Sequence, residues 1–415
     1  MGDGSAPIED SAFVVRDGHF AAVGTRGRIE VPRGATHVNL AGRTVMPALV
    51  NAHVHIGYEG YTSWGAKNYT PQNVLDHLRR EAYYGVAATQ SVGSSPTDAA
   101  LQFVQDQQAG RFAPASRFFF MPGMAPPNGG PDAILIKATS ELKVVYEVST
   151  PAAARAAVQS MVAKGIKQVK IWVDDRRGTY PKMTPDVYTA IIDEAHRNGM
   201  LVHAHAIQMA DQKAVVRAGV DVLVHTVQNE PIDDELMGLL REKKPYWTTV
   251  IGLGDRSEAC DSDPFVDATY PASTLHEIRE KDCTPRPADA NATRERILAQ
   301  NLPKYIASGA RLVLGTDAGI DARHAFGWAD HHELSRWVQS GISPADAIVA
   351  ATSRPAQLVG ATDLGSVATG KSADFLVLTA NPLEDIRNTR RIDKVYLQGT
   401  PLDREAMAKE FRNVR

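Results

Sequence analysis

The sequence is poor in cysteine, in net charge and in long apolar runs. Its 415 residues include two cysteines, Cys260 and Cys283, too few for a disulfide-rich framework or a cysteine-based zinc module. The 45 basic and 48 acidic side chains leave a net charge of −3, without the basic excess that is typical of nucleic-acid binding. There is also no run of about 18 consecutive apolar residues, the length of a membrane-spanning helix. We therefore expect a small-molecule substrate as the partner, and neither a nucleic acid nor a membrane.

Both cysteines lie in one polar segment, and their state is open to two interpretations. We expect two free thiols, with a single disulfide within the segment as the alternative. The first residues are small and polar and lack the basic and apolar regions of a signal peptide. The expected location is therefore the cytoplasm, and export with removal of a leader is the alternative.

Short apolar runs alternate with amphipathic segments through the middle of the chain. Buried parallel strands read as continuous apolar runs, and the segments between them, such as Pro71–Tyr84 and Pro151–Lys164, begin with proline as helices often do. Eight such β–α units over about 300 residues predict an α/β fold of the (β/α)8 or TIM-barrel type. The runs are Val45–Val54, Val86–Val92, Phe118–Met121, Val169–Val173, Leu201–Ala206, Val222–Val227, Trp247–Leu253 and Leu312–Gly315.

The two ends of the chain are rich in strand signals. Asp17-Gly18 lies between two strand-like segments and predicts a hairpin, and Ala373–Leu378 is a strand-like segment near the other end. We therefore expect a small β-sandwich domain built from both ends, residues 1–47 and 363–415, with the barrel formed by residues 48–362.

One long polar segment interrupts the alternation. The residues from Asp255 to Asn291 are polar and contain prolines. Long loops without a regular pattern are commonly functional, and barrel active sites are built from the loops that follow the strands. We expect this segment to lie over the site and to act as a lid.

Polar side chains interrupt the apolar strands near their carboxyl ends. His53 and His55 end the first strand, where residues two apart point the same way, and neutral imidazole is a good zinc ligand. Lys170 lies within the fourth strand, where an unpaired ammonium group is costly. Either a salt bridge or reaction with carbon dioxide to give a carbamate would resolve that cost. Further polar groups end the fifth, sixth and eighth strands: His203, His205, His225 and Asp317.

This set of residues predicts a metal-assisted hydrolase, because active sites of barrels occupy the carboxyl ends of the strands. Two cations would share a water molecule and lower its pKa toward 7, which makes a hydroxide nucleophile. Asp317 would accept the proton and pass it to the leaving group.

With these residues identified, the sequence resembles the amidohydrolase superfamily. Val45–His55 is similar to the first-strand motif, with Ala48 and Asn51 in place of a common glycine and aspartate. Gly370–Leu378 and Asn381–Ile386 resemble the tail that re-enters the small β domain. Within the superfamily, the chain looks like the imidazolonepropionase-like branch, which includes Xaa-Arg and Xaa-Pro dipeptidases and ochratoxinase.

The resemblance implies a binuclear site with two divalent metal ions, expected to be zinc. The more buried ion would be held by His53, His55 and Asp317, the more exposed one by His205 and His225, and both by a carboxylated Lys170. The resemblance favours His205 over His203 as the strand-five ligand, because relatives keep a fixed spacing to the strand-six histidine. It also implies a homo-oligomer.

Four further residues are candidates for contact with a ligand or with substrate: His203, His324, His331 and Tyr58. The expected reaction is hydrolysis of an amide or peptide-type C–N bond in a dipeptide, an N-acyl amino acid or a related amide. The alternatives are a mononuclear cyclic-amide hydrolase or deaminase, an ester or lactone hydrolase on the same scaffold, and a non-catalytic scaffold.

Overall fold

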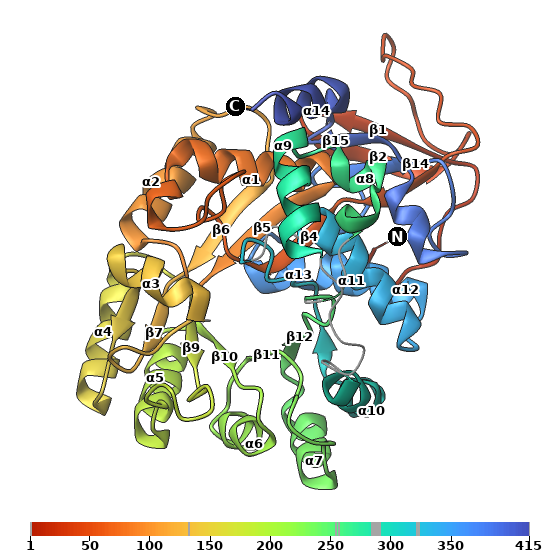
Figure 1. Ribbon diagram of the computed structural model, residues 1–415. Coiled ribbons are helices and arrows are strands. Elements are labelled where there is room, and N and C mark those ends of the chain that lie inside the picture. The colour runs from red at the N-terminus through yellow and green to blue at the C-terminus, as the bar shows by residue number, and fades with distance from the viewer. Residues whose placement is uncertain are drawn as a thin grey trace.

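Parallel strands surrounded by helices form the centre of the molecule (Figure 1). The computed structural model describes residues 2–131, 133–253, 255, 258–283, 292–320 and 324–414. One set of parallel strands comprises β4 (Leu49–Val54), β5 (Val86–Val92) and β6 (Arg117–Met121). A second set, in the order β13-β12-β11-β10-β9-β7-β8, comprises β7 (Gly123–Ala125), β8 (Val145–Glu147), β9 (Gln168–Trp172), β10 (Leu201–His205), β11 (Val222–Val224), β12 (Tyr246–Thr248) and β13 (Arg311–Leu312).

Backbone hydrogen bonds join these two sets of strands at both edges. The Ala52 N–H in β4 donates to the Leu314 carbonyl, just beyond β13, over 2.9 Å. At the other edge, the Lys170 N–H in β9 donates to the carbonyl of Pro122, the residue between β6 and β7, over 2.9 Å. The predicted α/β class with parallel strands is therefore confirmed.

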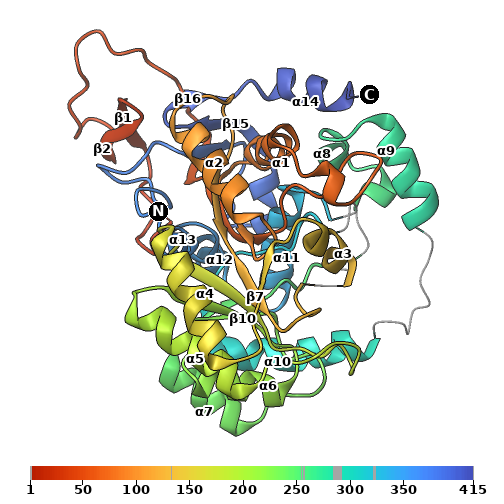
Figure 2. The same ribbon diagram turned by 90° about the vertical axis from the view of Figure 1, so that its left-hand side faces the viewer.

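Helices follow most of the strands and lie outside them (Figures 1 and 2). Thr70 and Thr150 each cap a helix through the side-chain oxygen, and a proline occupies the first turn, which is a favourable start. The helices are α1 (Pro71–Tyr83), α2 (Thr97–Gln108), α3 (Ala133–Glu141), α4 (Pro151–Ala163), α5 (Pro185–Arg197), α6 (Met209–Arg217), α7 (Asp234–Lys243), α10 (Ala292–Ser308), α11 (Trp328–Gln339), α12 (Pro344–Ala351), α13 (Ser353–Val359) and α14 (Arg404–Arg412), with short turns η1 (Ala66–Asn68) and η4 (Ile386–Arg390). Among the described residues, no helix is long and apolar enough to cross a membrane.

Strands from the two ends of the chain pair with one another. β3 (Thr44–Pro47) pairs antiparallel with β14 (Phe375–Leu378), which pairs with β15 (Ile392–Leu397) and through it with β16 (Thr400–Pro401). β1 (Ser11–Arg16) and β2 (His19–Thr25) form the predicted hairpin.

The first apolar run is not the single strand that we predicted. It divides at Ala48, because the Ala48 N–H donates to the Asp374 carbonyl of the small sheet while the Leu49 N–H donates to the Gly85 carbonyl beside β5. The chain therefore changes sheets between β3 and β4. The runs at Trp247–Leu253 and Leu312–Gly315 are also shorter as strands, since only β12 and β13 form ladders there.

The two cysteines are joined by a disulfide, so the expectation of two free thiols is wrong. Cys260 and Cys283 lie 23 residues apart in the sequence, with Cα atoms 5.6 Å apart. Cys260 lies within η2 (Glu258–Asp261), and between the two cysteines follow α8 (Pro264–Asp267), α9 (Ala272–Glu277) and η3 (Ile278–Asp282). The predicted long loop is thus partly helical, and it packs beside α1 and α14 (Figure 2). Residues 256–257 and 284–291 of the predicted lid lie outside the described residues.

Removal of the disulfide is expected to lower stability. The double variant Cys260→Ser/Cys283→Ser removes the cross-link, so the unfolded chain gains conformational entropy. For a loop of this size the expected loss of unfolding free energy is roughly 3 kcal/mol. Thermal unfolding of the wild type with and without reductant, beside the double variant, measures the effect. The reduced wild type should match the variant, and reductant should leave the variant unchanged. An equal melting temperature for oxidised wild type and variant would contradict the prediction.

Candidate metal centre

Two histidines and one aspartate meet at the end of the parallel strands. His53 lies near the end of β4, His55 directly follows that strand, and Asp317 follows the last parallel strand. Asp317 Oδ1 lies 2.8 Å from His53 Nε2 and 3.3 Å from His55 Nε2. One ligand atom from each residue fits within a mutual separation of 4.8 Å. All three side chains are buried, so this group could bind a metal ion.

The backbone holds these three residues in place. The Asp317 N–H donates to the His53 carbonyl (3.0 Å), and the His55 N–H donates to the Ala318 carbonyl (2.8 Å). Asp317 and His225 have φ angles of 58° and 72°, a region that residues other than glycine rarely adopt. Such strain is often found at functional sites, where the surrounding structure enforces it.

The remaining candidate ligands lie beside this group. His225 Nε2 is 3.7 Å from Asp317 Oδ2, and the ring of His225 lies 4.8 Å from that of His205 between centroids. Lys170 is buried in β9, in register with His203 of β10. The structure thus brings the six residues of the predicted ligand set to the same ends of neighbouring strands.

Burial sets the charge state of the histidines. It lowers the pKa of His53 to about 4, and the nearby Lys170 lowers it further against the opposing effect of Asp317. Burial likewise holds the pKa values of His203 and His225 well below the usual range. At neutral pH these imidazoles are uncharged, which is the form that binds a metal.

Asp317 fits the role of a metal ligand. Burial acts to raise its pKa, but His53 and His225 outweigh burial and hold that pKa well below the usual range. Although His53 lies close to Oδ1, neither carboxyl oxygen receives a well-directed hydrogen bond from the described residues. A buried carboxylate of this kind is costly unless it is paired or binds a cation.

The four additional candidates have different surroundings. His203 Nε2 contacts Gln168 Oε1 at 2.9 Å. The Tyr58 hydroxyl donates to the Ser94 carbonyl, and His324 Nε2 contacts the Thr316 carbonyl at 2.8 Å, next to Asp317. His331 uses both ring nitrogens elsewhere, with Thr389 Oγ1 and the Tyr84 carbonyl, each at 2.9 Å. Within the part of the chain that the structure describes, no hydrogen bond or ion pair joins His331 to the ligand group.

Sequence reasoning did not identify the side chains that support the ligands. Ser94 Oγ lies 2.9 Å from His55 Nδ1. Asn51 Oδ1 accepts the His53 N–H, and its amide donates to Thr316 Oγ1 over 2.9 Å. The only local signal is the position of Asn51 two residues before His53. Ser94 comes from the loop after β5, and no sequence pattern connects it with His55.

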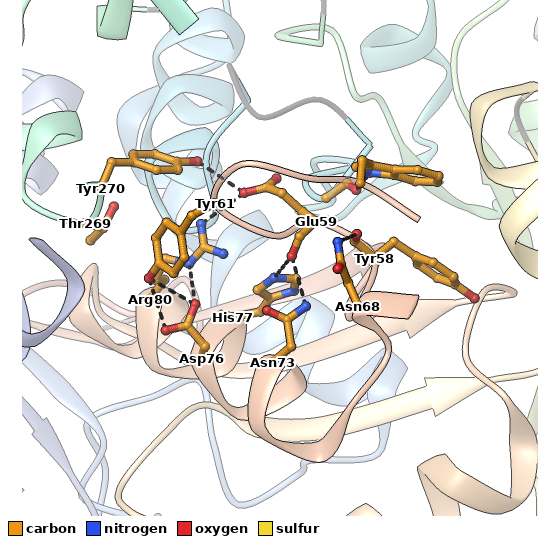
Figure 3. Close-up of polar contacts among 12 residues, drawn as sticks. Tyr58, Glu59, Tyr61, Asn68, Asn73, Asp76, His77, Arg80, Thr269 and Tyr270 are labelled. Carbon is orange, nitrogen blue, oxygen red and sulfur yellow. Dashed lines mark hydrogen bonds and ion pairs between the residues drawn. The ribbon is translucent and has the colours of Figure 1, made fainter. Parts of the chain in front are cut away.

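A buried arginine anchors the loop that follows His55 (Figure 3). Arg80 of α1 lies 3.0 Å from Glu59 Oε1 and 3.1 Å from Asp76 Oδ2. The rings of Tyr61 and Tyr270 lie within 5.4 Å of its guanidinium carbon. Tyr270 belongs to the disulfide-bonded segment, so Arg80 connects this segment to the loop after β4.

Two buried acidic side chains from different helices contact each other. Glu81 of α1 and Asp330 of α11 are both fully buried. Burial raises the pKa of Asp330 to about 8, and burial together with Asp330 raises the pKa of Glu81 well above its usual range. The two carboxyl groups therefore retain protons at pH values where exposed carboxyl groups are charged.

Stability is expected to fall with rising pH because of this pair. A carboxyl group whose pKa is higher in the folded than in the unfolded protein stabilises the fold fully at pH values below its unfolded-state pKa. This stabilisation is lost as the pH rises through its folded-state pKa. The loss is about 1.4 kcal/mol per pH unit for each retained proton. Between pH 6 and 8, Glu81→Gln should therefore gain stability relative to the wild type in urea unfolding. The control Glu405→Gln, at an exposed position, should show the same pH dependence of the unfolding free energy as the wild type. The same pH dependence in Glu81→Gln would show that Glu81 does not retain a proton in this range.

Comparison with known proteins places this geometry in context. A model of the amidohydrolase family matches residues 44–402. The chain is 25% identical to ochratoxinase of Aspergillus niger over 427 residues, covering 93% of this chain and 80% of that protein. A structure of a Xaa-Pro dipeptidase with bound methionine has a TM-score of 0.73 at 24% identity, over 94% of each chain. A structure of phenylurea hydrolase B has a TM-score of 0.75 at 23% identity, over 98% of this chain and 96% of that one.

These matches confirm the resemblance that the strand-end residues and the tail motif indicated. The family match covers the parallel strands, every candidate ligand and β3, β14 and β15 of the small sheet. The structural likenesses are below 25% identity and support the fold alone. The chain belongs to the amidohydrolase family.

Proposed function

We propose that this protein is a metal-dependent hydrolase that cleaves an amide or peptide-type C–N bond. The observation that carries the proposal is the buried group of His53, His55 and Asp317, whose carboxyl oxygens lack a well-directed hydrogen bond from the described residues. Neutral imidazoles and a carboxylate form a donor set that zinc accepts readily. Family membership supports a hydrolytic reaction.

Two divalent ions would be held by this site. His53, His55 and Asp317 would bind one of them, and His205 and His225 would bind the other. A carboxylated Lys170 would bridge both. The burial of Lys170 beside the candidate histidine ligands supports this assignment, because a carbamate at this position is an anion suited to the cations.

The chain's own residues would then move the proton. When bound, the ions would supply an activated water and a Lewis acid for the substrate carbonyl. Asp317 is ionised at neutral pH, so it accepts a proton from the attacking water. It then donates that proton to the leaving nitrogen, which lets an amine depart instead of an unstable amide anion.

The names of the relatives support a substrate class for this proposal. A Xaa-Pro dipeptidase is named for a peptide substrate and phenylurea hydrolase B for a phenylurea. We propose a dipeptide, an N-acyl amino acid or a related amide for this chain. The architecture proposed with it is a closed (β/α)8 barrel of residues 48–362 with a small β-sandwich domain of residues 1–47 and 363–415. The hydrogen bonds at both edges of the parallel strands support that closure.

The disulfide also bears on where the protein works. Disulfides persist in oxidising compartments and are rare in the cytosol. The Cys260–Cys283 bond therefore favours an exported protein over the cytoplasmic location that we expected from the first residues.

Metal counting and one lysine variant test the proposal. We expect about two zinc ions per chain and turnover of at least one member of an amide panel, lost with a chelator and restored by zinc. Lys170→Ala should lower activity more than about 100-fold, since even partners of ligands cost 10–100-fold. Lys167→Ala is the matched control, because Lys167 is exposed and directly precedes the same strand. One ion per chain, together with a fully active Lys170→Ala, would refute the binuclear site.

A further inference from the structure

One candidate ligand is oriented differently from the others. The Nε2 atoms of His53, His55 and His225 all face Asp317, at 2.8, 3.3 and 3.7 Å. His205 instead directs Nε2 at Asp174 Oδ2, over 3.0 Å. Both partners of this contact are buried. An ionised carboxylate can only accept a hydrogen bond, so Nε2 of His205 donates it, and Nδ1 is the ring nitrogen that is left to bind a metal.

Asp174 is itself held on more than one side. Its Oδ1 accepts the Arg176 N–H over 2.9 Å, and the guanidinium of Arg176 lies 3.6 Å from Oδ2. The same guanidinium donates to the Gly130 carbonyl over 2.9 Å. Hydrogen bonds therefore run from the loop after β7 through Arg176 and Asp174 to His205.

The local backbone brings this chain of contacts to the site. Asp174 lies two residues beyond the end of β9, and the preceding Val173 N–H donates to the His205 carbonyl over 2.9 Å. The loop after β9 is thus attached to the end of β10 at both backbone and side chain. The position of Asp174 relative to His205 is therefore set by two independent hydrogen bonds.

We propose that Asp174 is a positioning residue that fixes the ring and tautomer of His205 so that Nδ1 faces the more exposed metal ion. The inference rests on the proposed metal-dependent function. A histidine that binds a metal commonly donates its other N–H to a carboxylate, which orients the ring and raises its basicity. Because both Asp174 oxygens are already engaged, the structure favours this role over direct binding of a substrate amine.

Zinc affinity provides the test. Full-length wild type, Asp174→Ala, Asp174→Asn and Asp174→Glu are titrated with Zn²⁺ against a competing chelator, and the melting temperature of each metal-free protein is recorded. Asp174→Ala should lower the affinity for one zinc ion about 10–100-fold and change the affinity for the other by less than about twofold. Asp174→Asn, a neutral acceptor of the same shape, should weaken that ion less, and Asp174→Glu should restore part of the affinity. The neighbouring Asp175→Asn removes a charge that contacts Lys182 instead and should change neither ion.

The outcomes separate this inference from the proposed function. Two ions of unchanged affinity in Asp174→Ala would overturn the role of Asp174 and leave the binuclear site intact. An equal loss of affinity for both ions, together with a lower melting temperature of the metal-free protein, would show that Asp174 has a general structural role. This outcome would also overturn the proposed positioning role. If the wild type binds one ion, the binuclear proposal fails. A lower affinity for that single ion in Asp174→Ala would then still support the positioning role of Asp174, and an unchanged affinity would overturn it.

Discussion

Replacing Asp317 with asparagine should lower kcat/KM about 10²–10⁴-fold, the usual contribution of a positioned general base. Asp317 is buried among the candidate ligands, and its neighbours keep it ionised at neutral pH. Asparagine has nearly the same shape but accepts no proton at neutral pH. The attacking water would then keep its proton, and the leaving nitrogen would have no donor.

Metal content must be measured in the same sample, because Asp317 is also a proposed ligand. Two retained zinc ions with lost activity would assign the loss to proton transfer, whereas a lost ion would assign part of it to binding. Asp98→Asn on α2, whose side chain is 83% exposed, is the matched control and should keep full activity. An Asp317→Asn protein with both ions and more than about a tenth of wild-type activity would exclude Asp317 as the proton carrier.

Replacing Arg80 with methionine should cost about 3–5 kcal/mol of unfolding free energy, the range for breaking one side of a buried ion pair. The Arg80 and Glu59 side chains are 1% and 2% exposed. Methionine fills much of the space between the aromatic rings. It supplies no charge, so the Glu59 carboxylate would stay buried without its guanidinium partner.

Urea unfolding of Arg80→Met beside Arg79→Met isolates this effect. Arg79 is the adjacent arginine, and its partner Glu410 is 57% exposed, so the control should lose less than about 1 kcal/mol. Adding Glu59→Gln to Arg80→Met should recover part of the loss, since the buried charge disappears as well. A loss below about 1 kcal/mol for Arg80→Met would show that the guanidinium is not essential to this packing.

Local sequence patterns were sufficient to indicate the candidate ligands and most of the parallel strands, although β7 and β8 lie outside the predicted runs. A strand buried on both faces must be apolar along its length, so polar side chains such as Lys170 and His205 are conspicuous in the sequence itself. Spacing of two residues also determined that His53 and His55 point the same way. These inferences depend only on the periodicity of a strand, which is a property of neighbouring residues.

The partners of those residues were decided by the tertiary structure. His55 contacts Ser94, His205 contacts Asp174, and Glu81 faces Asp330. Each pair joins different elements, and many side chains in the sequence could equally have supplied the partner. A buried polar group needs a partner, but which one it finds depends on how helices and loops pack.

The cysteines and the first apolar run show the same division. The sequence by itself determined that two cysteines share one polar segment, but only the fold brings their Cα atoms to 5.6 Å. The run Val45–Val54 is apolar throughout, and only the competing carbonyls of Asp374 and Gly85 decide that it changes sheets at Ala48. The sequence thus determined which strands are buried and which of their side chains are candidates for chemistry. Long-range hydrogen bonding decided their pairing, because those bonds form only after distant segments have packed together.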